Sequence, residues 1–139
     1  MVRITDMQII DLLERDARTP ASHIAEELGV TETAIRKRMA KLQEKKIVTQ
    51  HTIRVSPRKS DFLIVFVGIY TKAESYRKIS NELKEKSYVK RMYSTSGDHH
   101  LQLECWFTSN EEFHESLHKH EKNPEITKIC PGIAQEQIK

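Results

Sequence analysis

The sequence predicts an α+β protein with an N-terminal helix-turn-helix, winged-helix-like domain and a C-terminal ferredoxin-like βαββαβ domain. Three short stretches with helical spacing of apolar residues lie close together in the first third of the 139 residues. Strand-like and helix-like stretches then follow in the order of the split βαβ unit. The segment Ser-Pro-Arg-Lys-Ser at residues 56–60 breaks the pattern between them. We therefore expect two domains, residues 1–56 and 61–139.

Two helices are expected before residue 30. The first has Thr5 or Asp6 as its N-cap and ends near residues 15–18. The second begins with Thr19 as N-cap and Pro20 at the first helical position, and it stops at Gly29. The apolar positions expected to face the core are Ile9, Ile10, Leu12, Leu13, Ile24, Ala25 and Leu28.

A third helix follows after only three connecting residues, 29–31. Thr31 can cap this helix, which should run from Glu32 to about Lys45. Two helices joined so tightly must cross steeply, as in a helix-turn-helix. Behind the third helix, β-branched residues between positions 47 and 55 alternate in part, which predicts a strand or a short wing.

Positive charge is concentrated around the third helix. Residues 31–60 contain 9 Lys and Arg against 2 Asp and Glu, a net charge of +7. Residues 1–30 contain 3 against 6, a net charge of −3. A concentration of one sign suits a polyanionic partner, because neutralising phosphates releases counterions, whereas a merely solvated face usually mixes its signs. The charge distribution therefore favours nucleic acid as the partner.

The third helix has one apolar side and one cationic side. Ile35, Met39 and Leu42 face the other two helices, and the opposite side can enter the major groove of double-stranded DNA. Arg36 and Lys37 are the leading candidates for base contacts. The full set of predicted DNA-binding residues is Thr31, Thr33, Arg36, Lys37, Arg38 and Lys41. Among these, Arg38 lies on the apolar side, so it is expected along the core edge, reaching a carboxylate or a phosphate.

The second domain is expected to contain four strands and two helices. The strands are predicted at residues 62–70, 89–94, 101–108 and 127–137, and the helices at 74–86 and 110–121. Asn110 is the expected N-cap of the second of these helices.

The first strand of this domain is apolar on both faces. Two helices can cover one face of the sheet, which leaves the other available for a symmetric partner. We therefore predict a homodimer, with Ile64, Phe66 and Leu103 in its interface. The alternative is that the linker or the N-terminal helices fold back over this face.

Composition excludes several classes of protein. An apolar fraction of 37% with 31% charged residues fits neither a disordered chain nor a membrane protein. The longest apolar run, residues 62–70, has half the length that a bilayer requires, and no leader segment is evident, so we expect a cytoplasmic protein. Two cysteines, Cys105 and Cys130, are too few for a disulfide framework or a zinc knuckle.

No pattern indicates catalysis. His114 and His118 have the i, i+4 spacing of metal ligands, but a third ligand and the glutamate of a hydrolytic zinc helix are missing. Neither a glycine-rich phosphate loop nor a nucleophile elbow is present. We expect no enzyme, no cofactor and no metal.

The sequence resembles the Lrp/AsnC, or feast/famine, family of transcription regulators over nearly the whole chain. The residues that carry the resemblance are Thr5-Asp6 to Leu13, Asp16-Ala17-Arg18, Ile24-Ala25, Leu28-Gly29-Val30-Thr31, Ile35, Arg38, Leu42 and Ile47. The resemblance implies a regulator of bacterial or archaeal type whose second domain pairs into dimers, often assembled into octamers. The chain departs from the family pattern at Lys46, a position after the third helix where the family usually has a glycine.

The resemblance also implies an amino-acid effector, bound near the loop at residues 96–101. The candidate effector-binding residues are Gly97, Asp98, His99 and His100. Here His100 occupies the place of an aspartate, and a histidine suits an ammonium group only when it is neutral and accepting. Asp98 is the possible substitute anion.

Together these observations predict a sequence-specific double-stranded DNA-binding transcription regulator that acts as a homodimer or higher oligomer, modulated by a small molecule such as an amino acid. The alternative is a protein-interaction adaptor, or a co-regulator that recruits a basal factor without binding an effector. In an archaeal activator, that factor would be the TATA-binding protein. RNA binding of the RRM kind is disfavoured because residues 101–107 lack its basic-glycine-aromatic signature.

Overall fold

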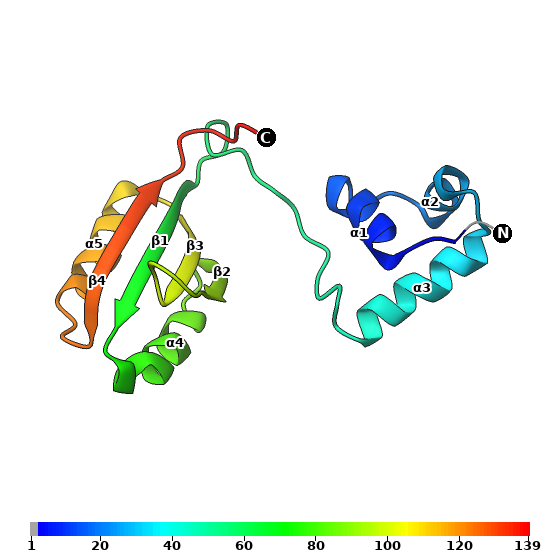
Figure 1. Ribbon diagram of the computed structural model, residues 1–139. Coiled ribbons are helices and arrows are strands. Elements are labelled where there is room, and N and C mark those ends of the chain that lie inside the picture. The colour runs from blue at the N-terminus through cyan, green and yellow to red at the C-terminus, as the bar shows by residue number, and fades with distance from the viewer. Residues whose placement is uncertain (1–2) are drawn as a thin grey trace. The chain divides into compact units, whose positions relative to one another are not determined.

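The computed structural model describes residues 3–139, which divide into two compact units with the boundary between residues 54 and 55. Three helices form the first unit: α1 (Asp6–Arg15), α2 (Ala21–Leu28) and α3 (Glu32–Glu44) (Figure 1). The second unit is a four-stranded antiparallel sheet with two α-helices and one short 3₁₀ turn. This arrangement confirms the predicted α+β fold class.

Local chemistry at the start of α1 fits the prediction. Thr5 is the N-cap, and its hydroxyl accepts a hydrogen bond from the backbone N–H of Gln8 at 3.3 Å. The Gln8 side chain accepts in return from the backbone N–H of Thr5 at 2.8 Å. This reciprocal capping box satisfies two N–H groups that a helix leaves unpaired at its start.

The start of α2 corrects the prediction by one residue. Pro20, rather than Thr19, occupies the N-cap position, with an extended backbone at φ −66° and ψ 148° and no side-chain cap. The Thr19 hydroxyl instead donates to the carbonyl of Asp16 at 2.7 Å, in the turn that precedes the helix. At the other end Gly29 has φ 68°, the left-handed conformation expected of a helix stop.

The core of the first unit consists of apolar side chains from all three helices. The buried members are Ile4, Ile9, Leu13, Ala21, Ile24, Ala25, Ile35 and Leu42. Ile9, Ile24 and Ile35, one from each helix, are fully buried. These contacts fix α3 against α1 and α2, so its opposite side is left exposed.

The strand predicted for residues 47–55 is not formed. A strand needs a partner to take up its backbone hydrogen bonds, and β-branched residues alone do not supply one. The segment lies instead against its own domain: His51 shares a hydrogen bond with Gln43 at 2.9 Å, and Arg54 pairs with Glu14. The wing prediction is therefore wrong for these residues.

The sheet of the second unit has the strand order β2-β3-β1-β4. Its strands are β1 (Leu63–Thr71), β2 (Val89–Ser94), β3 (Leu101–Phe107) and β4 (Ile126–Ile133). β1 lies between β3 and β4, with Val67 opposite Leu103 on one side and Pro131 on the other. A proline is compatible with β4 because this strand is at the edge of the sheet. β4 ends at Ile133 rather than Gln137, although the N–H of Ala134 still donates to the carbonyl of Ile64 at 2.9 Å.

The helices of the second unit pack on one face of the sheet. A 3₁₀ turn (Ala73–Ser75) precedes α4 (Tyr76–Lys84), so the predicted helix at 74–86 is shorter and begins with a tighter turn. α5 (Asn110–Glu121) has the predicted bounds, but its N-cap is Ser109, whose hydroxyl accepts from the N–H of Glu112 at 3.1 Å. Ile79, Leu83 and Phe113 from these helices join the core with the odd-numbered residues of β1.

Candidate nucleic-acid interface

The third helix presents a rigid, exposed polar side. Thr31 caps it by accepting from the N–H of Ala34 at 3.2 Å, as predicted. Ile35 and Leu42, which are 0% and 2% exposed, anchor the inner side. The predicted groove-facing residues on the outer side are all exposed: Thr33, Arg36, Lys37, Ala40 and Lys41. A helix held this way can place its outer side chains in a groove without reorganising the domain.

Arg36 is paired within the helix. Its guanidinium Nε lies 2.7 Å and its Nη2 lies 2.5 Å from Oε1 of Glu32, one turn earlier. The two side chains are 68% and 44% exposed, so the pair contributes only about 0.3–0.5 kcal/mol and can be exchanged for a stronger contact. Lys37 and Lys41 have no ion pair among residues 3–139. The i, i+4 spacing of Glu32 and Arg36 is the signal in the sequence that predicts this pair.

Arg38 differs from the other cations of α3. Its Nη1 donates to Oδ1 of Asp6 at 3.0 Å, joining α3 to the first turn of α1. A carboxylate was one of the two partners predicted for Arg38. The pair is partly exposed, with 39% of the Arg38 side chain accessible. In the free protein Arg38 therefore orients α3 on α1, and its reach to a phosphate remains a prediction.

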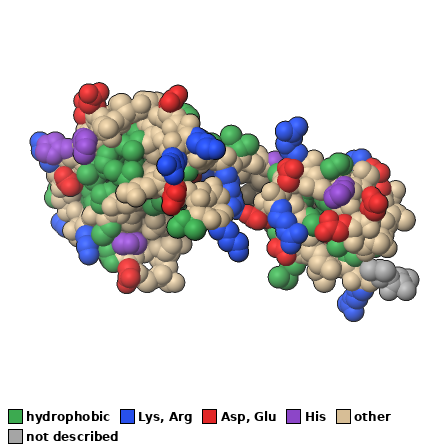
Figure 2. Space-filling model, turned by 90° about the horizontal axis from the view of Figure 1, so that it is seen from above, with side chains coloured by type: hydrophobic (Ala, Val, Ile, Leu, Met, Phe, Trp, Pro, Cys, Tyr) green, Lys and Arg blue, Asp and Glu red, His purple; other side chains and the backbone are tan. Residues whose placement is uncertain are grey.

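Charges of both signs lie on the surface of the first unit. The face shown in Figure 2 has Lys and Arg side chains interspersed with Asp and Glu. The acidic residues belong mainly to the segment before residue 30, whose net charge is −3, as the sequence shows. The segment of +7 begins with α3, so the positive potential is local to this helix and the residues after it.

The candidate effector loop packs onto β1 through its two histidines. The His99 ring covers Gly68 so closely that an added Cβ there would lie 2.5 Å from ring atoms. His100 accepts a hydrogen bond at Nδ1 from the N–H of Thr71, at 3.1 Å. Both rings contact Tyr70 edge-on, with centroids 5.3 and 5.2 Å away. The Nδ1 of His100 is therefore occupied as the acceptor for the backbone N–H of Thr71.

The two other candidate residues of this loop, Gly97 and Asp98, are exposed. Gly97 has φ 114°, a conformation that favours glycine, and an added Cβ would meet nothing within 4 Å. Asp98 is exposed. Among the four predicted effector residues, Asp98 is thus the one that offers a solvent-accessible carboxylate to an ammonium group.

The predicted dimer residues do not all lie on the same face of the sheet. Phe66 is 45% exposed on the face opposite the helices. Ile64 shares this face by strand alternation but is only 4% exposed. Leu103 is 2% exposed and belongs to the core beneath the helices, so its assignment to the interface is wrong. Antiparallel register pairs Leu103 with Val67, which also faces the helices.

A polar network lies on the helix-free face of the sheet. Glu104 accepts from Nη1 of Arg91 at 2.8 Å and from Nε1 of Trp106 at 2.8 Å. The Trp106 ring also packs against Phe62, with centroids 5.3 Å apart. The helix-free face therefore combines exposed aromatic rings with the Glu104 carboxylate, which is hydrogen-bonded by Arg91 and Trp106.

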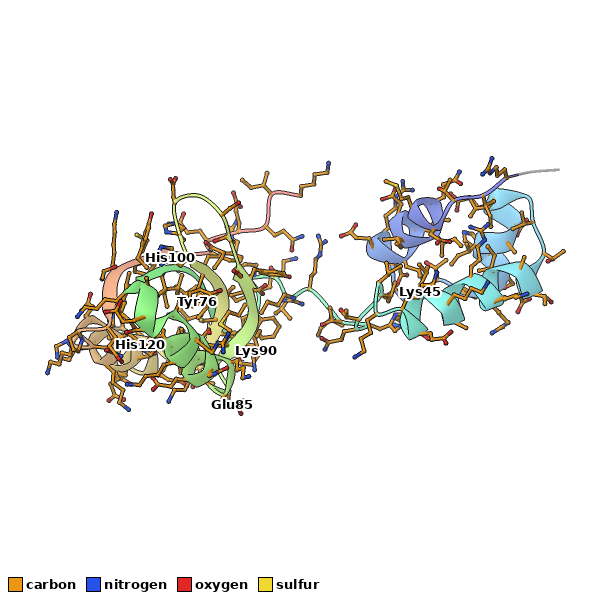
Figure 3. All side chains as sticks on the ribbon, turned by 60° about the horizontal axis from the view of Figure 1, so that its bottom comes forward. Lys45, Tyr76, Glu85, Lys90, His100 and His120 are labelled. Atoms are coloured by element: carbon orange, nitrogen blue, oxygen red, sulfur yellow. The ribbon has the colours of Figure 1, made fainter. Side chains whose placement is uncertain are left out.

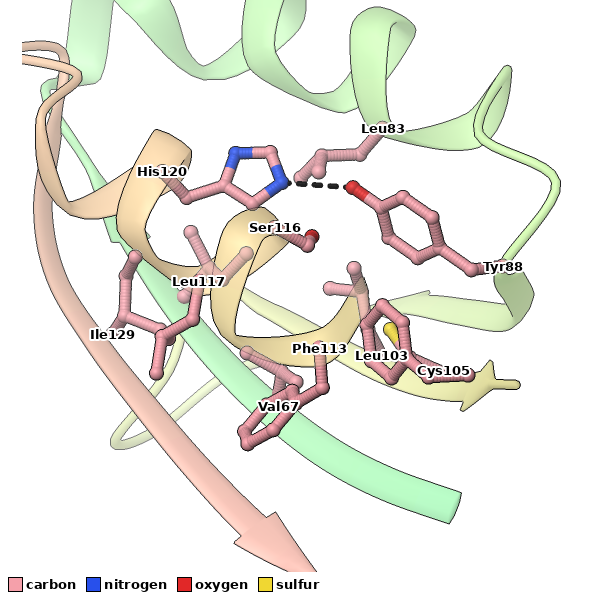
Figure 4. Close-up of a pocket in the computed structure, with 12 residues that line it drawn as sticks. Val67, Leu83, Tyr88, Leu103, Cys105, Phe113, Ser116, Leu117, His120 and Ile129 are labelled. Atoms are coloured by element: carbon pink, nitrogen blue, oxygen red, sulfur yellow. Dashed lines mark hydrogen bonds between the residues drawn. The ribbon is translucent and has the colours of Figure 1, made fainter. Parts of the chain in front are cut away.

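An apolar pocket lies between the helices and the sheet. Its lining includes Tyr88 and His120, whose Oη and Nε2 share a hydrogen bond at 2.9 Å (Figure 4). Burial lowers the pKa of His120 and raises the pKa of Tyr88, since each charged form would be poorly solvated there. Burial also raises the pKa of the Cys105 thiol to about 12, so it is not a reactive thiolate at neutral pH.

The described residues contain no cluster of potential metal ligands. Among residues 3–139, no three His, Cys, Asp or Glu side chains are placed so that they could share a metal ion. Cys105 and Cys130 are both free thiols. Within the same residues, no helix is long and apolar enough to cross a membrane.

The packed three-helix unit with an exposed cationic third helix, joined to a ferredoxin-like unit, defines a helix-turn-helix DNA-binding protein. The AsnC-type helix-turn-helix domain matches residues 4–43. The chain is 37% identical to the HTH-type transcriptional regulator LrpA of Pyrococcus horikoshii over 141 residues, covering all of both chains.

Solved structures show the same fold over the whole length. A structure described as PH0061 is 19% identical, with a TM-score of 0.84 and coverage of 100% of this chain and 97% of that one. The regulator NMB0573 of Neisseria meningitidis, solved as an L-Met complex, is 19% identical, with a TM-score of 0.75 and coverage of 100% and 93%. The chain belongs to the Lrp/AsnC family of transcription regulators, and this is not a family of enzymes.

Proposed function

We propose that this regulator binds double-stranded DNA in a sequence-specific manner as a homodimer, through the outer side of α3. The observation that carries the proposal is the exposed set Thr33, Lys37 and Lys41, on a helix whose opposite side is anchored by Ile35 and Leu42. Such a helix can read base edges with its first turns and grip phosphates with its cations. A regulator of this kind works in the cytoplasm, where the chromosome of a bacterial or archaeal cell lies.

Arg36 and Lys37 are the proposed base-contacting residues, and Thr31, Thr33, Arg38 and Lys41 the supporting ones. Arg36 must leave Glu32 to reach a base, and the small stability of that exposed pair makes the exchange inexpensive. Lys37 needs no such exchange. We therefore place Lys37 first among the six for base contact.

Dimerisation supplies two recognition helices. We propose that the helix-free face of the sheet, which includes Phe66, is the symmetric interface, because the helices of its own unit leave aromatic side chains exposed there. Two symmetry-related α3 helices then require an imperfect palindrome with half-sites separated by about 10 base pairs or a multiple of this. Higher assemblies, such as an octamer, would build on this dimer.

The test is selection of binding sites from random duplexes, followed by measurement of affinity for the selected and for scrambled duplexes. The variant Arg36→Ala/Lys37→Ala should lose the preference, with each base contact worth about 1–3 kcal/mol, and should keep its fold. An unchanged footprint would contradict the assignment of these two residues. Binding to proteins alone, with no duplex bound at low salt, would favour the adaptor function instead.

An amino-acid effector is proposed with Asp98 as the anion for its ammonium group. The exposed carboxylate of Asp98 supports this choice, as does the L-Met complex of the Neisseria relative. His100 is occupied by the backbone of Thr71, which weighs against its acting as the ammonium acceptor. A rise in melting temperature with one of the twenty amino acids, lost in Asp98→Asn, would support the site. No shift with any of the twenty would remove it.

The proposal extends to recruitment of a basal factor. If the protein activates transcription in an archaeal system, its DNA-bound dimer would hold the TATA-binding protein at an adjacent promoter. Co-occupancy of one duplex by both proteins, tighter than by either alone, would support this function. Mutual exclusion on every spacing would contradict it.

A further inference from the structure

The helices α2 and α3 end with the same backbone motif. After α2, Val30 donates to the carbonyl of Ala25 at 2.9 Å, and Gly29 donates to that of Glu26 at 3.3 Å. After α3, Ile47 donates to the carbonyl of Leu42 at 2.9 Å, and Lys46 donates to that of Gln43 at 3.0 Å. Both pairs have the six-to-one and five-to-two pattern of a Schellman motif.

The motif requires a left-handed residue, and the two helices differ in which residue provides it. Gly29 has φ 68° and Lys46 has φ 55°. Among residues 3–139, Lys46 is the one residue other than glycine with a positive φ. A residue with a Cβ is disfavoured in this conformation, whereas glycine is not. The same domain thus has a glycine in the left-handed conformation at the end of α2, and a lysine in this disfavoured conformation at the end of α3.

The side chain of Lys46 has no structural partner that would account for its presence. It is exposed, and it makes no ion pair or side-chain hydrogen bond with any of residues 3–139. A cation near a helix C-terminus is favourable, but Lys41 already places positive charge in the last turn of α3, and Lys45 does so at its C-cap. Lys45 lies where the helix ends, directly before the turn (Figure 3).

The length of α3 places Lys46 beyond the groove that the helix would enter. Thirteen residues extend about 20 Å, whereas the major groove is about 12 Å wide. When the first turns of α3 contact bases and the helix axis crosses the groove, its last turn lies at the level of the phosphates. A cation that projects from the end of the helix is then positioned for the DNA backbone.

We propose that Lys46 is a phosphate-binding residue, and that its strained conformation is retained for the charge that a glycine cannot supply. The inference rests on the proposed DNA-binding function and adds a contact outside the matched helix-turn-helix domain, which ends at residue 43. This contact is to the sugar-phosphate backbone, so it contributes affinity without sequence preference.

Two substitutions separate charge from strain. Lys46→Gly removes both, and Lys46→Gln removes the charge but keeps a Cβ in the left-handed conformation. Lys84→Gln, in the last turn of α4 in the other unit, is the matched control for loss of one exposed lysine. For each full-length variant we would measure the melting temperature and the affinity for a selected duplex between about 0.05 and 0.5 M salt.

Both Lys46 variants should bind DNA more weakly, with the salt slope reduced by about 1 for each Lys46 engaged, hence about 2 for a dimer. With a slope of about 0.9 per contact, one phosphate contact makes the affinity at 0.1 M salt roughly eightfold higher than at 1 M salt. Lys46→Gly should also melt about 2–8 °C higher, because the strain is relieved, whereas Lys46→Gln should not. Stability and DNA affinity thus move in opposite directions in Lys46→Gly.

The outcomes against the proposal are distinct. Wild-type salt slopes in both Lys46 variants, with DNA binding intact, would overturn the role of Lys46 alone. A lower melting temperature in Lys46→Gly would show that the lysine stabilises the helix end and would overturn the strain argument. Absence of DNA binding by the unaltered protein would overturn the proposed function, and the role of Lys46 with it.

Discussion

The substitution Phe66→Glu should dissociate the proposed dimer while leaving each protomer folded. Phe66 lies on the helix-free face of β1 and is 45% exposed in the single chain. A carboxylate at this position remains in contact with water in the monomer, so the cost to folding is small. In the dimer the same carboxylate would face an apolar surface across the symmetry axis.

The magnitude follows from the area that Phe66 exposes. With a side chain of about 200 Å², 45% exposure corresponds to about 90 Å² in each protomer. A symmetric dimer would bury this area twice, about 180 Å², which is worth roughly 4–5 kcal/mol at about 25 cal/mol per Å². Loss of this amount raises the dissociation constant about a thousandfold, and desolvation of the carboxylate adds to it.

Sedimentation velocity over a concentration series measures this change, with circular dichroism to check the fold. Asn81→Glu, an exposed position on α4, introduces the same charge on the helix-covered side and should associate like the unaltered protein. DNA affinity should fall with Phe66→Glu as well, because the two α3 helices no longer act together. A Phe66→Glu protein with the wild-type dissociation constant would refute the assignment of this face.

Three further predictions concern local structure. Thr31→Ala should lower the free energy of unfolding by about 1 kcal/mol in denaturant titrations, because the α3 cap is lost, whereas Thr33→Ala, which removes no cap, should change it little. Gly68→Ala should destabilise the protein by about 1–3 kcal/mol, since its Cβ would overlap the His99 ring; an unchanged melting temperature would show that the loop does not pack as described. The pKa of His120 is lowered below its ordinary 6.5 by burial, so the unfolded chain takes up a proton at higher pH than the folded protein. Stability should therefore fall as pH drops below about 6.5, and this decline should be smaller in His120→Gln; equal pH profiles would contradict the burial of the histidine.

Much of the fold follows from spacing and capping chemistry. The sequence predicts Thr31 as one cap and Thr5 or Asp6 as the other, because a side-chain oxygen before an apolar periodic stretch can accept from the first free N–H groups; the structure has Thr5 and Thr31. The alternation in β1 separated Phe66 from Val67 correctly, because a strand turns successive side chains to opposite faces. Local rules of this kind need no knowledge of distant residues.

Most of the errors concern contacts with residues distant along the chain, which the local sequence does not specify. Alternation in β3 shows that Leu101, Leu103 and Cys105 share a face, but only the pairing of Leu103 with Val67 decides which face meets the helices. Residues 47–55 have strand-like composition, but none of the four strands among residues 3–139 pairs with them. The start of α2 was misassigned because Pro20 satisfies the N-cap conformation as well as the first helical position.

Within the candidate site, sequence reasoning identified the cations but not their partners. The ion pair of Arg36 with Glu32 was readable from the i, i+4 spacing. The pair of Arg38 with Asp6 depends on how α3 crosses α1, so the sequence restricted its partner only to a carboxylate or a phosphate. The sequence has Lys46 where the family usually has a glycine. The positive φ of Lys46 shows that this position adopts the left-handed conformation, which favours glycine.

A structure of the protein bound to a selected operator duplex tests the central claim most directly. The account predicts that the exposed side of α3 lies in the major groove, with Lys37 within hydrogen-bonding distance of a base edge and the two recognition helices about one helical turn of DNA, or a multiple of one turn, apart. A complex in which α3 faces away from the duplex, or in which the DNA lies on the sheet unit alone, would contradict it.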